Sequence, residues 1–171
     1  MAHNKISRDE APIRLFESDV LEFFTHIHPA VIVIIWLPVA AYAFARAFMD
    51  ARLASWHVVL GTLAGFVIWT LAEYTLHRFV FHFKPRNAWQ ERLSFLFHGV
   101  HHAQPRSKTR LVMPPAISVP LGALFYGLFA LMVGQLLRAP GWIAPLFAGF
   151  TAGYLTYDLT HYATHHFRMK R

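Results

Sequence analysis

Long runs of apolar residues, each about the length of a bilayer crossing, dominate the chain from residue 29 onward. A membrane-spanning helix needs about 20 predominantly apolar residues. By this criterion the sequence predicts about four spans, at residues 29–48, 56–83, 111–137 and 142–162. The second is longer than a crossing requires, so we expect its end to project beyond the hydrocarbon. The pattern therefore predicts an all-α integral membrane protein.

The polar residues divide the chain further. Residues 1–28 precede the first predicted span and are mixed in charge. Within them, residues 12–24 interleave apolar and charged side chains, as is typical of a short amphipathic segment at a membrane interface. Residues 84–110 form the one long polar segment between predicted spans. We thus expect an interfacial segment, 1–28, a membrane domain, 29–171, and a polar loop, 84–110, outside the bilayer.

Composition supports a membrane protein. The chain is 56% hydrophobic and only 15% charged, whereas soluble domains carry about 25% charged residues. It contains no cysteine, which excludes disulfides, thiolate-held zinc and iron–sulfur clusters, so that any metal must be held by nitrogen and oxygen. Small residues let membrane helices approach closely. We therefore expect close helix contacts at four glycines spaced four residues apart in pairs: Gly61, Gly65, Gly149 and Gly153.

The net charge of +7 predicts membrane topology. The basic residues flank apolar spans and form no separate basic domain, so we expect anionic lipid head groups and not nucleic acid as partners. Four spans place the N-terminus, loop 84–110 and the C-terminus on one side, and basic residues gather on the cytoplasmic side of membrane proteins. That side carries Lys5, Arg8, Arg14, Lys84, Arg86, Arg92, Arg106, Lys108, Arg110, Arg168, Lys170 and Arg171, and the other only Arg46, Arg52 and Arg138. We expect a cytoplasmic face, at the plasma membrane of a bacterium or the endoplasmic reticulum of a eukaryote.

Histidines mark the same face. Three groups lie where predicted spans meet water: His77 and His82; His98, His101 and His102; and His161, His165 and His166. Imidazole is the commonest metal ligand among side chains, and such clusters beside lipid are costly unless something binds them. The sequence therefore predicts a metal centre held by these eight histidines just below a membrane surface.

Spacing favours two metals over one. Helix residues three or four apart share a face, so His98 shares one with His101 and His102, which still diverge enough to serve two metals. His161 and His165 are also four apart. His77 and His82 are five apart and would diverge on a regular helix, so either the helix loosens near His82 or the two reach separate ions.

Two carboxylates lie close to these histidines in the sequence. Glu73 precedes His77 by one helical turn, and Asp158 precedes His161 by three residues. Ligating histidines usually donate their other ring N–H to a carboxylate or carbonyl. We expect both carboxylates to orient ligands first, and to bind metal directly only second.

The segments HRFVFH, HGVHH and HYATHH, at their separations, resemble the histidine boxes of the membrane fatty acid hydroxylase and sterol desaturase superfamily. The fatty acid 2-hydroxylase branch is the most similar, through PIRLFESDVLEFF, EYTLHRFVFH, RLVMPP and YDLTHYATHH. The resemblance implies that the histidines hold two iron ions and that O2 is a co-substrate. All-histidine sites also bind zinc well, so zinc can replace iron in a purified sample. It implies hydroxylation at carbon 2 of a long acyl chain, free or sphingolipid-linked. Two electrons would come from a separate donor, such as a cytochrome-b-type protein or a ferredoxin with its reductase.

One feature departs from this pattern. Relatives of the branch carry a further HxxHH box soon after the HYxxHH stretch, whereas this sequence ends at Arg171 before one. We therefore expect the eight histidines to hold two metals less completely than in relatives. The alternatives are a desaturase or a sterol or carotenoid hydroxylase with the same centre, and a non-catalytic metal-binding membrane protein.

Overall fold

The computed structural model describes residues 13–50, 53–105 and 107–167, and within them the chain is helical and has no strand. The predicted all-α class is confirmed. The α-helices are α1 (Asp19–Phe23), α2 (Pro29–Met49), α3 (Ser55–Thr75), α4 (Ala88–Ser94), α5 (Val100–Ala103), α6 (Pro115–Phe129) and α7 (Ile143–His166). Three π-helical segments adjoin them, η1 (Leu76–Phe81), η2 (Phe95–Gly99) and η3 (Ala130–Leu136), and a 3-10 turn, η4 (Pro140–Trp142), precedes α7.

These elements form two compact units. The first, which we call the histidine unit, comprises Met1–Pro29, Glu73–Pro114 and Asp158–Arg171. The second, the bundle unit, comprises Ala30–Ala72 and Pro115–Tyr157. Helices α3 and α7 each begin in the bundle unit and continue into the histidine unit.

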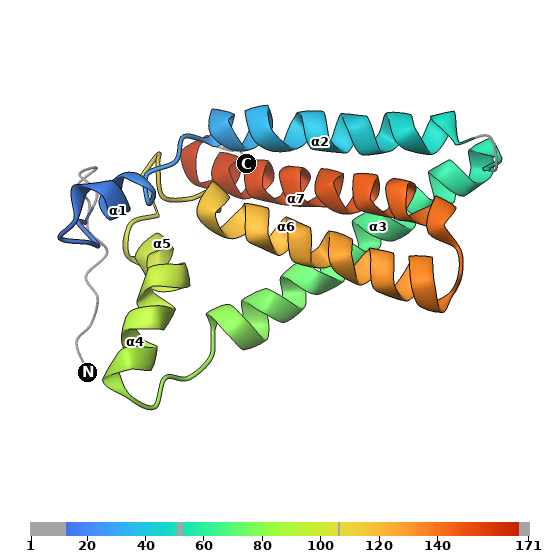
Figure 1. The fold of residues 1–171 in the computed structure, drawn as a ribbon. Coiled ribbons are helices and arrows are strands. Elements are labelled where there is room, and N and C mark those ends of the chain that lie inside the picture. The colour runs from blue at the N-terminus through green and yellow to red at the C-terminus, as the bar shows by residue number, and fades with distance from the viewer. Residues whose placement is uncertain (1–12, 51–52, 106, 168–171) are drawn as a thin grey trace. The chain divides into compact units, whose positions relative to one another are not determined.

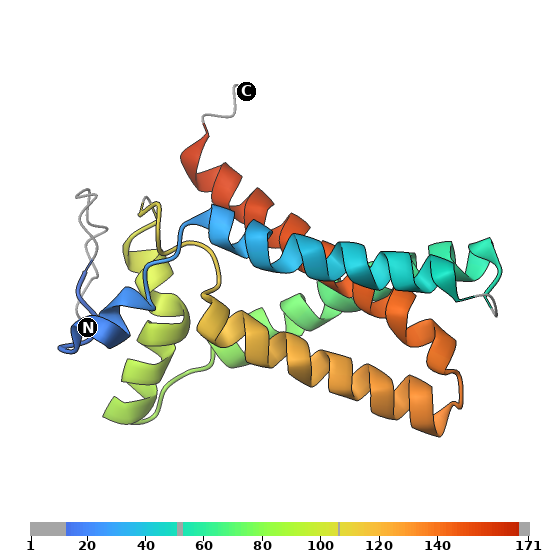
Figure 2. The same ribbon diagram turned by 45° about the horizontal axis from the view of Figure 1, so that its top comes forward.

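Helix α7 is the centre of the bundle unit. In Figures 1 and 2, α2, α6 and α7 run alongside one another and α3 crosses them at an angle. Aromatic rings of α7 contact each neighbour: Tyr154 lies 5.6 Å from Trp36 of α2, and Phe150 lies 4.5 Å from Phe125 of α6 and 5.1 Å from Trp69 of α3. Such edge and offset contacts are favourable beyond the area that they bury.

Glycine allows α3 and α7 to approach backbone to backbone. A Cβ atom at Gly65 would overlap the carbonyl of Leu146, and one at Gly149 would overlap the carbonyl of Thr62. At Gly61 and Gly153 it would press against Pro145 and Trp69. The close contacts that the glycine spacing predicts are confirmed, and they join these two helices.

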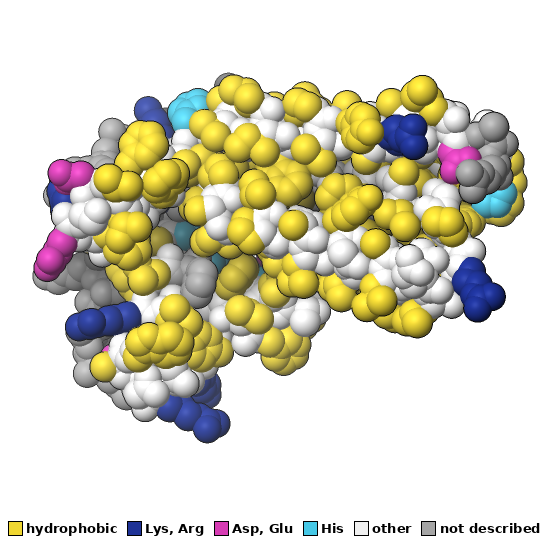
Figure 3. All heavy atoms as spheres, viewed as in Figure 1, with side chains coloured by type: hydrophobic (Ala, Val, Ile, Leu, Met, Phe, Trp, Pro, Cys, Tyr) yellow, Lys and Arg dark blue, Asp and Glu magenta, His cyan; other side chains and the backbone are white. Residues whose placement is uncertain are grey.

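The surface of the bundle unit is apolar. Figure 3 shows hydrophobic side chains over the visible face of its helices, and large exposed ones include Ile34, Leu37, Leu63, Val67, Leu124 and Leu131. Among the described residues, three continuous helical stretches are long and apolar enough to cross a membrane: Pro29–Met49, Ser55–Phe81 and Pro115–Leu136. The chain is therefore an all-helical membrane protein, since a soluble surface would not expose so large an apolar area.

The fourth predicted span, 142–162, is also helical within α7 but is not among these three stretches. Helix α7 carries Asp158 and three histidines, and its residues 145–151 are buried. Because its neighbours cover it, α7 does not need a fully apolar composition. The second stretch has 27 residues, about 40 Å at 1.5 Å per residue, and so exceeds a hydrocarbon core of about 30 Å.

We predict that Gly149→Ala destabilises the folded protein by about 1–3 kcal/mol, because the added methyl group meets backbone that cannot rotate away. The matched control is Gly127→Ala in α6, where a Cβ would meet nothing within 4 Å. There, alanine should be neutral or stabilising by up to about 1 kcal/mol, because of its helix propensity. Thermal unfolding of both variants in detergent checks this, and equal midpoints for the two would contradict it.

Candidate metal centre

The first histidine pair owes its geometry to a π-helical segment. In η1 the backbone N–H of His82 donates to the carbonyl of His77 at 3.1 Å, so that the hydrogen bond spans five residues. In such a π-helical turn, residues five apart project from the same side, whereas on an α-helix they point in different directions. The Nε2 atoms of His77 and His82 consequently lie 3.0 Å apart. Of the two alternatives that the spacing left open, the structure shows the loosened helix.

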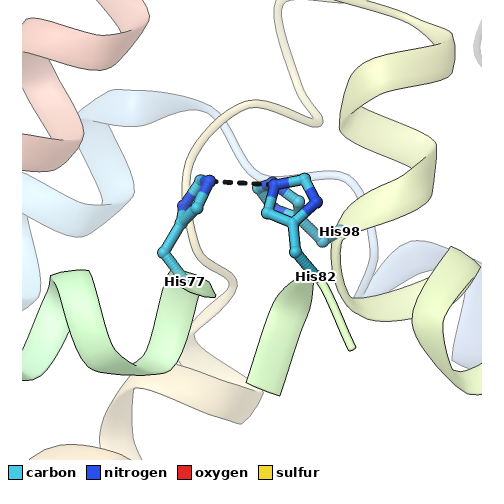
Figure 4. Close-up of side chains that lie close together, drawn as sticks. All are labelled: His77, His82 and His98. Atoms are coloured by element: carbon cyan, nitrogen blue, oxygen red, sulfur yellow. Dashed lines mark hydrogen bonds between the residues drawn. The ribbon is translucent and has the colours of Figure 1, made fainter. Parts of the chain in front are cut away.

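The second histidine box lies on a short helical stretch that begins with α4. Asn87 caps α4 by accepting the N–H of Gln90 at 2.9 Å, and the helix continues through η2 into α5. His98 lies in η2, where its ring centroid is 4.6 Å from that of His77 and 4.8 Å from that of His82. Figure 4 shows these three rings converging. Their ligand nitrogens all lie within 4.8 Å of one another, a separation that suits one metal ion.

A second group joins α5 to the end of α7. The Nε2 atoms of His101 and His161 lie 2.9 Å apart, and the ring of His165 is 5.2 Å from His101 and 4.9 Å from His161. These three residues also have ligand nitrogens within 4.8 Å of one another. His101 is buried, while His161 is half-buried and His165 exposed.

The two groups are neighbours, with His102 beside both. The rings of His98 and His101, one from each group, lie 5.5 Å apart. His102 lies 5.2 Å from His101 by ring centroid, and its Nε2 is 2.9 Å from that of His98. Seven of the eight predicted ligands are therefore brought together around two adjacent positions.

His166 is placed differently. Its ring stacks on Tyr162 with centroids 4.2 Å apart, and its Nδ1 lies 3.1 Å from the Tyr162 carbonyl. It belongs to neither group of three. Its role as a ligand stays a prediction, and the adjacent His165 holds the position in the second group.

The two predicted orienting carboxylates have different partners. Glu73 Oε1 lies 3.3 Å from Nδ1 of His77, which leaves Nε2 of that ring to face His82. Asp158 is buried and accepts the backbone N–H of Met113 at 3.1 Å. Glu73 thus contacts a histidine as expected, and Asp158 fastens the segment that follows loop 84–110.

Burial keeps two of these imidazoles neutral. It lowers the pKa of His98 to about 3, and the neighbouring His102, His77 and His82 lower it further in the same direction. Burial, and then His161 and His102, likewise lower the pKa of His101 to about 3. A neutral imidazole can offer a lone pair to a metal, whereas a protonated one cannot. The donor set, two adjacent groups of three converging imidazoles, fits two metal ions.

Two residues near the site were not singled out from the sequence. Arg110 is almost fully buried and pairs with Glu22, although 88 residues separate them. The only sequence signals are an acidic residue within the amphipathic segment 12–24 and an arginine directly before the apolar run at Leu111.

Acid should destabilise the metal-free protein. Because the folded-state pKa values of His98 and His101, about 3, lie below the usual value of about 6.5, the unfolded chain binds more protons between these limits. The stability contributed by the neutral rings is complete above pH 6.5 and is lost as the pH falls toward 3. Thermal midpoints of metal-free protein from pH 7.5 to 4 should fall, and less so in His98→Gln. Midpoints that do not change with pH would contradict this.

The neighbours His165 and His166 offer a matched comparison for metal binding. His165→Ala should remove or weaken by at least about tenfold one of two bound ions, because it deletes one of three ligands in its group. His166→Ala should have the smaller effect, because its ring belongs to neither group of three. Titration of metal-free protein with Co²⁺ checks this, and an equal loss in both variants would show that His166 is also a ligand.

Comparisons with known proteins identify the family. The model of the fatty acid hydroxylase family matches residues 62–171. The dihydroceramide fatty acyl 2-hydroxylase FAH1 of Arabidopsis thaliana is 37% identical over 165 residues, which cover 96% of this chain and 66% of that protein. The fatty acid 2-hydroxylase of Rattus norvegicus is 34% identical over 183 residues, covering 95% of this chain and 47% of that protein.

A solved structure has the same fold. It is described as full-length Scs7p with only the hydroxylase domain visible, and it matches with a TM-score of 0.79 and 36% identity over 89% of this chain and 56% of that one. The chain thus spans 66% or less of the lengths of these three relatives. The family model and these likenesses agree with the resemblance read from the histidine boxes, and the chain belongs to the fatty acid hydroxylase family.

Proposed function

We propose that this chain hydroxylates long fatty acyl groups at carbon 2, free or sphingolipid-linked, with O2 and two iron ions held by its histidines. The observation that carries the proposal is the pair of adjacent three-histidine groups, one formed by His77, His82 and His98 and the other by His101, His161 and His165. His102, beside both groups, is the seventh ligand. A purely structural cluster has no need for so many imidazoles facing one another.

Iron suits the reaction better than other metals that bind nitrogen. Imidazole ligands accept zinc, copper, iron and nickel, so zinc can replace iron at these sites in a purified sample. Zinc has no redox chemistry, whereas two iron ions, when bound, would change oxidation state, pass on the donor's electrons and activate O2, as hydroxylation of a C–H bond demands. The lack of cysteine agrees with a site built from nitrogen donors.

The chain's own residues orient the ligands and limit water. Glu73 Oε1 lies 3.3 Å from Nδ1 of His77, and Nε2 of the same ring faces His82. Phe81 stacks on His98 with ring centroids 5.5 Å apart and planes 17° from parallel. An apolar ring against a ligand fixes its orientation and keeps water from that side, which protects the reactive centre and offers a surface to an acyl chain.

The substrate class comes from the relatives. Their names specify dihydroceramide fatty acyl 2-hydroxylation in Arabidopsis thaliana and ceramide very long chain fatty acid hydroxylation in Schizosaccharomyces pombe. The apolar bundle surface places this chain in the bilayer, where such lipids reside. The reaction consumes the acyl C–H, O2, two electrons and two protons and yields the alcohol and water. The electrons come from a separate donor, a cytochrome-b-type protein or a ferredoxin with its reductase, on the cytoplasmic side.

Lipid profiling tests this function. Cells that express the chain together with a reductase-linked donor should accumulate 2-hydroxy acyl lipids, and His98→Ala should abolish them, because it removes a ligand of the first group. His28→Ala, an exposed histidine outside both groups, is the control and should leave the product unchanged. Desaturated lipids or hydroxylated sterols in place of 2-hydroxy acyl groups would assign a different reaction to the same centre.

An absence of every lipid product, with donor activity verified and protein present in membranes, would overturn the oxygenase assignment. The chain would then be a membrane protein that binds metal without catalysis.

A further inference from the structure

Five of the described residues in the loop that follows α5 are buried, although the loop is polar in sequence. Gln104, Ser107 and Arg110 are each 6% exposed or less, and Leu111 and Val112 are 7% or less. Buried polar side chains are costly unless they are paired, so this segment, residues 104–113, has specific partners. We call it the strut, because its two ends lie against helices that carry different histidines.

On one side the strut is fastened to the N-terminal segment. The backbone N–H of Ile13 donates to Oε1 of Gln104 at 2.8 Å, and that of Ile27 donates to the carbonyl of Thr109 at 2.8 Å. A third contact joins the same two segments: Nη2 of Arg110 donates to Oε1 of Glu22 at 2.5 Å. The segment 13–27 is therefore bonded to the strut through its first residue, through Glu22 and through its last residue.

Glu22 is the residue on which these contacts converge. Its Oε2 accepts the N–H groups of Leu15 and Phe16 at 2.8 and 2.9 Å, and its Oε1 also lies 3.1 Å from Nε2 of His26. The Arg110 side chain is 1% exposed and that of Glu22 is 13% exposed. Removing one member of such a pair is strongly destabilising, because the other is left as an unpaired buried charge.

On the other side the strut reaches the helices of the second histidine group. It begins at Gln104, whose N–H donates to Val100 in the helix of His101. It ends at Met113, whose N–H donates to Asp158 of α7, three residues before His161. The strut therefore links the two helices whose histidines approach each other most closely in this group.

The contact between the histidines is by itself too weak to hold α5 and α7 together. Nε2 of His101 and Nε2 of His161 lie 2.9 Å apart, and two neutral imidazoles contribute at most one weak hydrogen bond to holding them there. Ligands that are held in place before the metal arrives bind it more tightly, because binding then orders fewer side chains.

We propose that Glu22 and Arg110 are positioning residues for the metal centre, and that their ion pair holds the strut so that His101 meets His161 and His165. The inference rests on the proposed function, since it concerns the same centre. By this inference, residues 13–27 support metal binding without supplying a ligand themselves.

Cobalt binding to the metal-free chain in detergent tests this. Co²⁺ bound by imidazole absorbs visible light, so a titration reports the number of ions, their affinity and their ligand geometry without any turnover. Glu22→Gln should weaken one of the two ions about 10–100-fold, the usual effect of losing a supporting partner of a ligand, and should alter its spectrum. Glu17→Gln and Lys108→Met, exposed neighbours in the same two segments, are matched controls and should bind as the unmodified chain does.

The double variant Glu22→Gln/Arg110→Met separates positioning from folding. It removes the unpaired charge as well as the pair, and should recover at least about tenfold of the lost affinity, because a buried pair can be replaced by neutral groups at little cost. Circular dichroism and gel filtration establish that each variant is folded.

Three results would overturn the inference: unchanged cobalt binding in Glu22→Gln, equal weakening in the single and double variants, or loss of folded protein in both. If the unmodified chain itself binds no cobalt, the proposed metal centre fails, and the positioning role fails with it. If the unmodified chain binds two ions and Glu22→Gln does too with equal affinity, only the positioning role fails.

Discussion

The histidine unit depends on holding pairs of imidazole rings very close together. In three pairs the Nε2 atoms lie only 2.9 to 3.0 Å apart. If both rings of such a pair were protonated they would repel each other, so at least one ring has to be neutral, and other contacts have to hold the pair together. Burial lowers the pKa of His98 and of His101 to about 3, which keeps one ring neutral in two of the three pairs. Holding the rings together requires three segments distant in sequence to meet.

A different structural feature holds each of these segments in place. The π-helical turn at Leu76–Phe81 aligns His77 with His82, and the strut of residues 104–113 connects α5 to α7. In the bundle unit, the glycines of α3 and α7 bring those two helices together, and each helix then continues into the histidine unit. Helices α3 and α7 thus contribute residues to both units.

Much of this was predictable from the sequence, because the signals are local. Apolar runs predict helices that cross a bilayer, and the four-residue spacing of Gly61, Gly65, Gly149 and Gly153 predicts their close contact. The histidine boxes predict both the family and the clustering of ligands. The π-helical turn was only one of two alternatives, because a five-residue spacing does not reveal how the backbone accommodates it. The Glu22–Arg110 pair and the bond from Met113 to Asp158 were not foreseen, since pairings across 45 or more residues leave no periodic pattern.

The most direct test of the account is the iron content and Mössbauer spectrum of the protein isolated under reducing, anaerobic conditions and then exposed to O2. Two groups of histidines predict two iron ions per chain that become magnetically coupled ferric ions on oxidation. A single uncoupled iron, or zinc retained in cells that are replete with iron, would contradict a dinuclear iron centre.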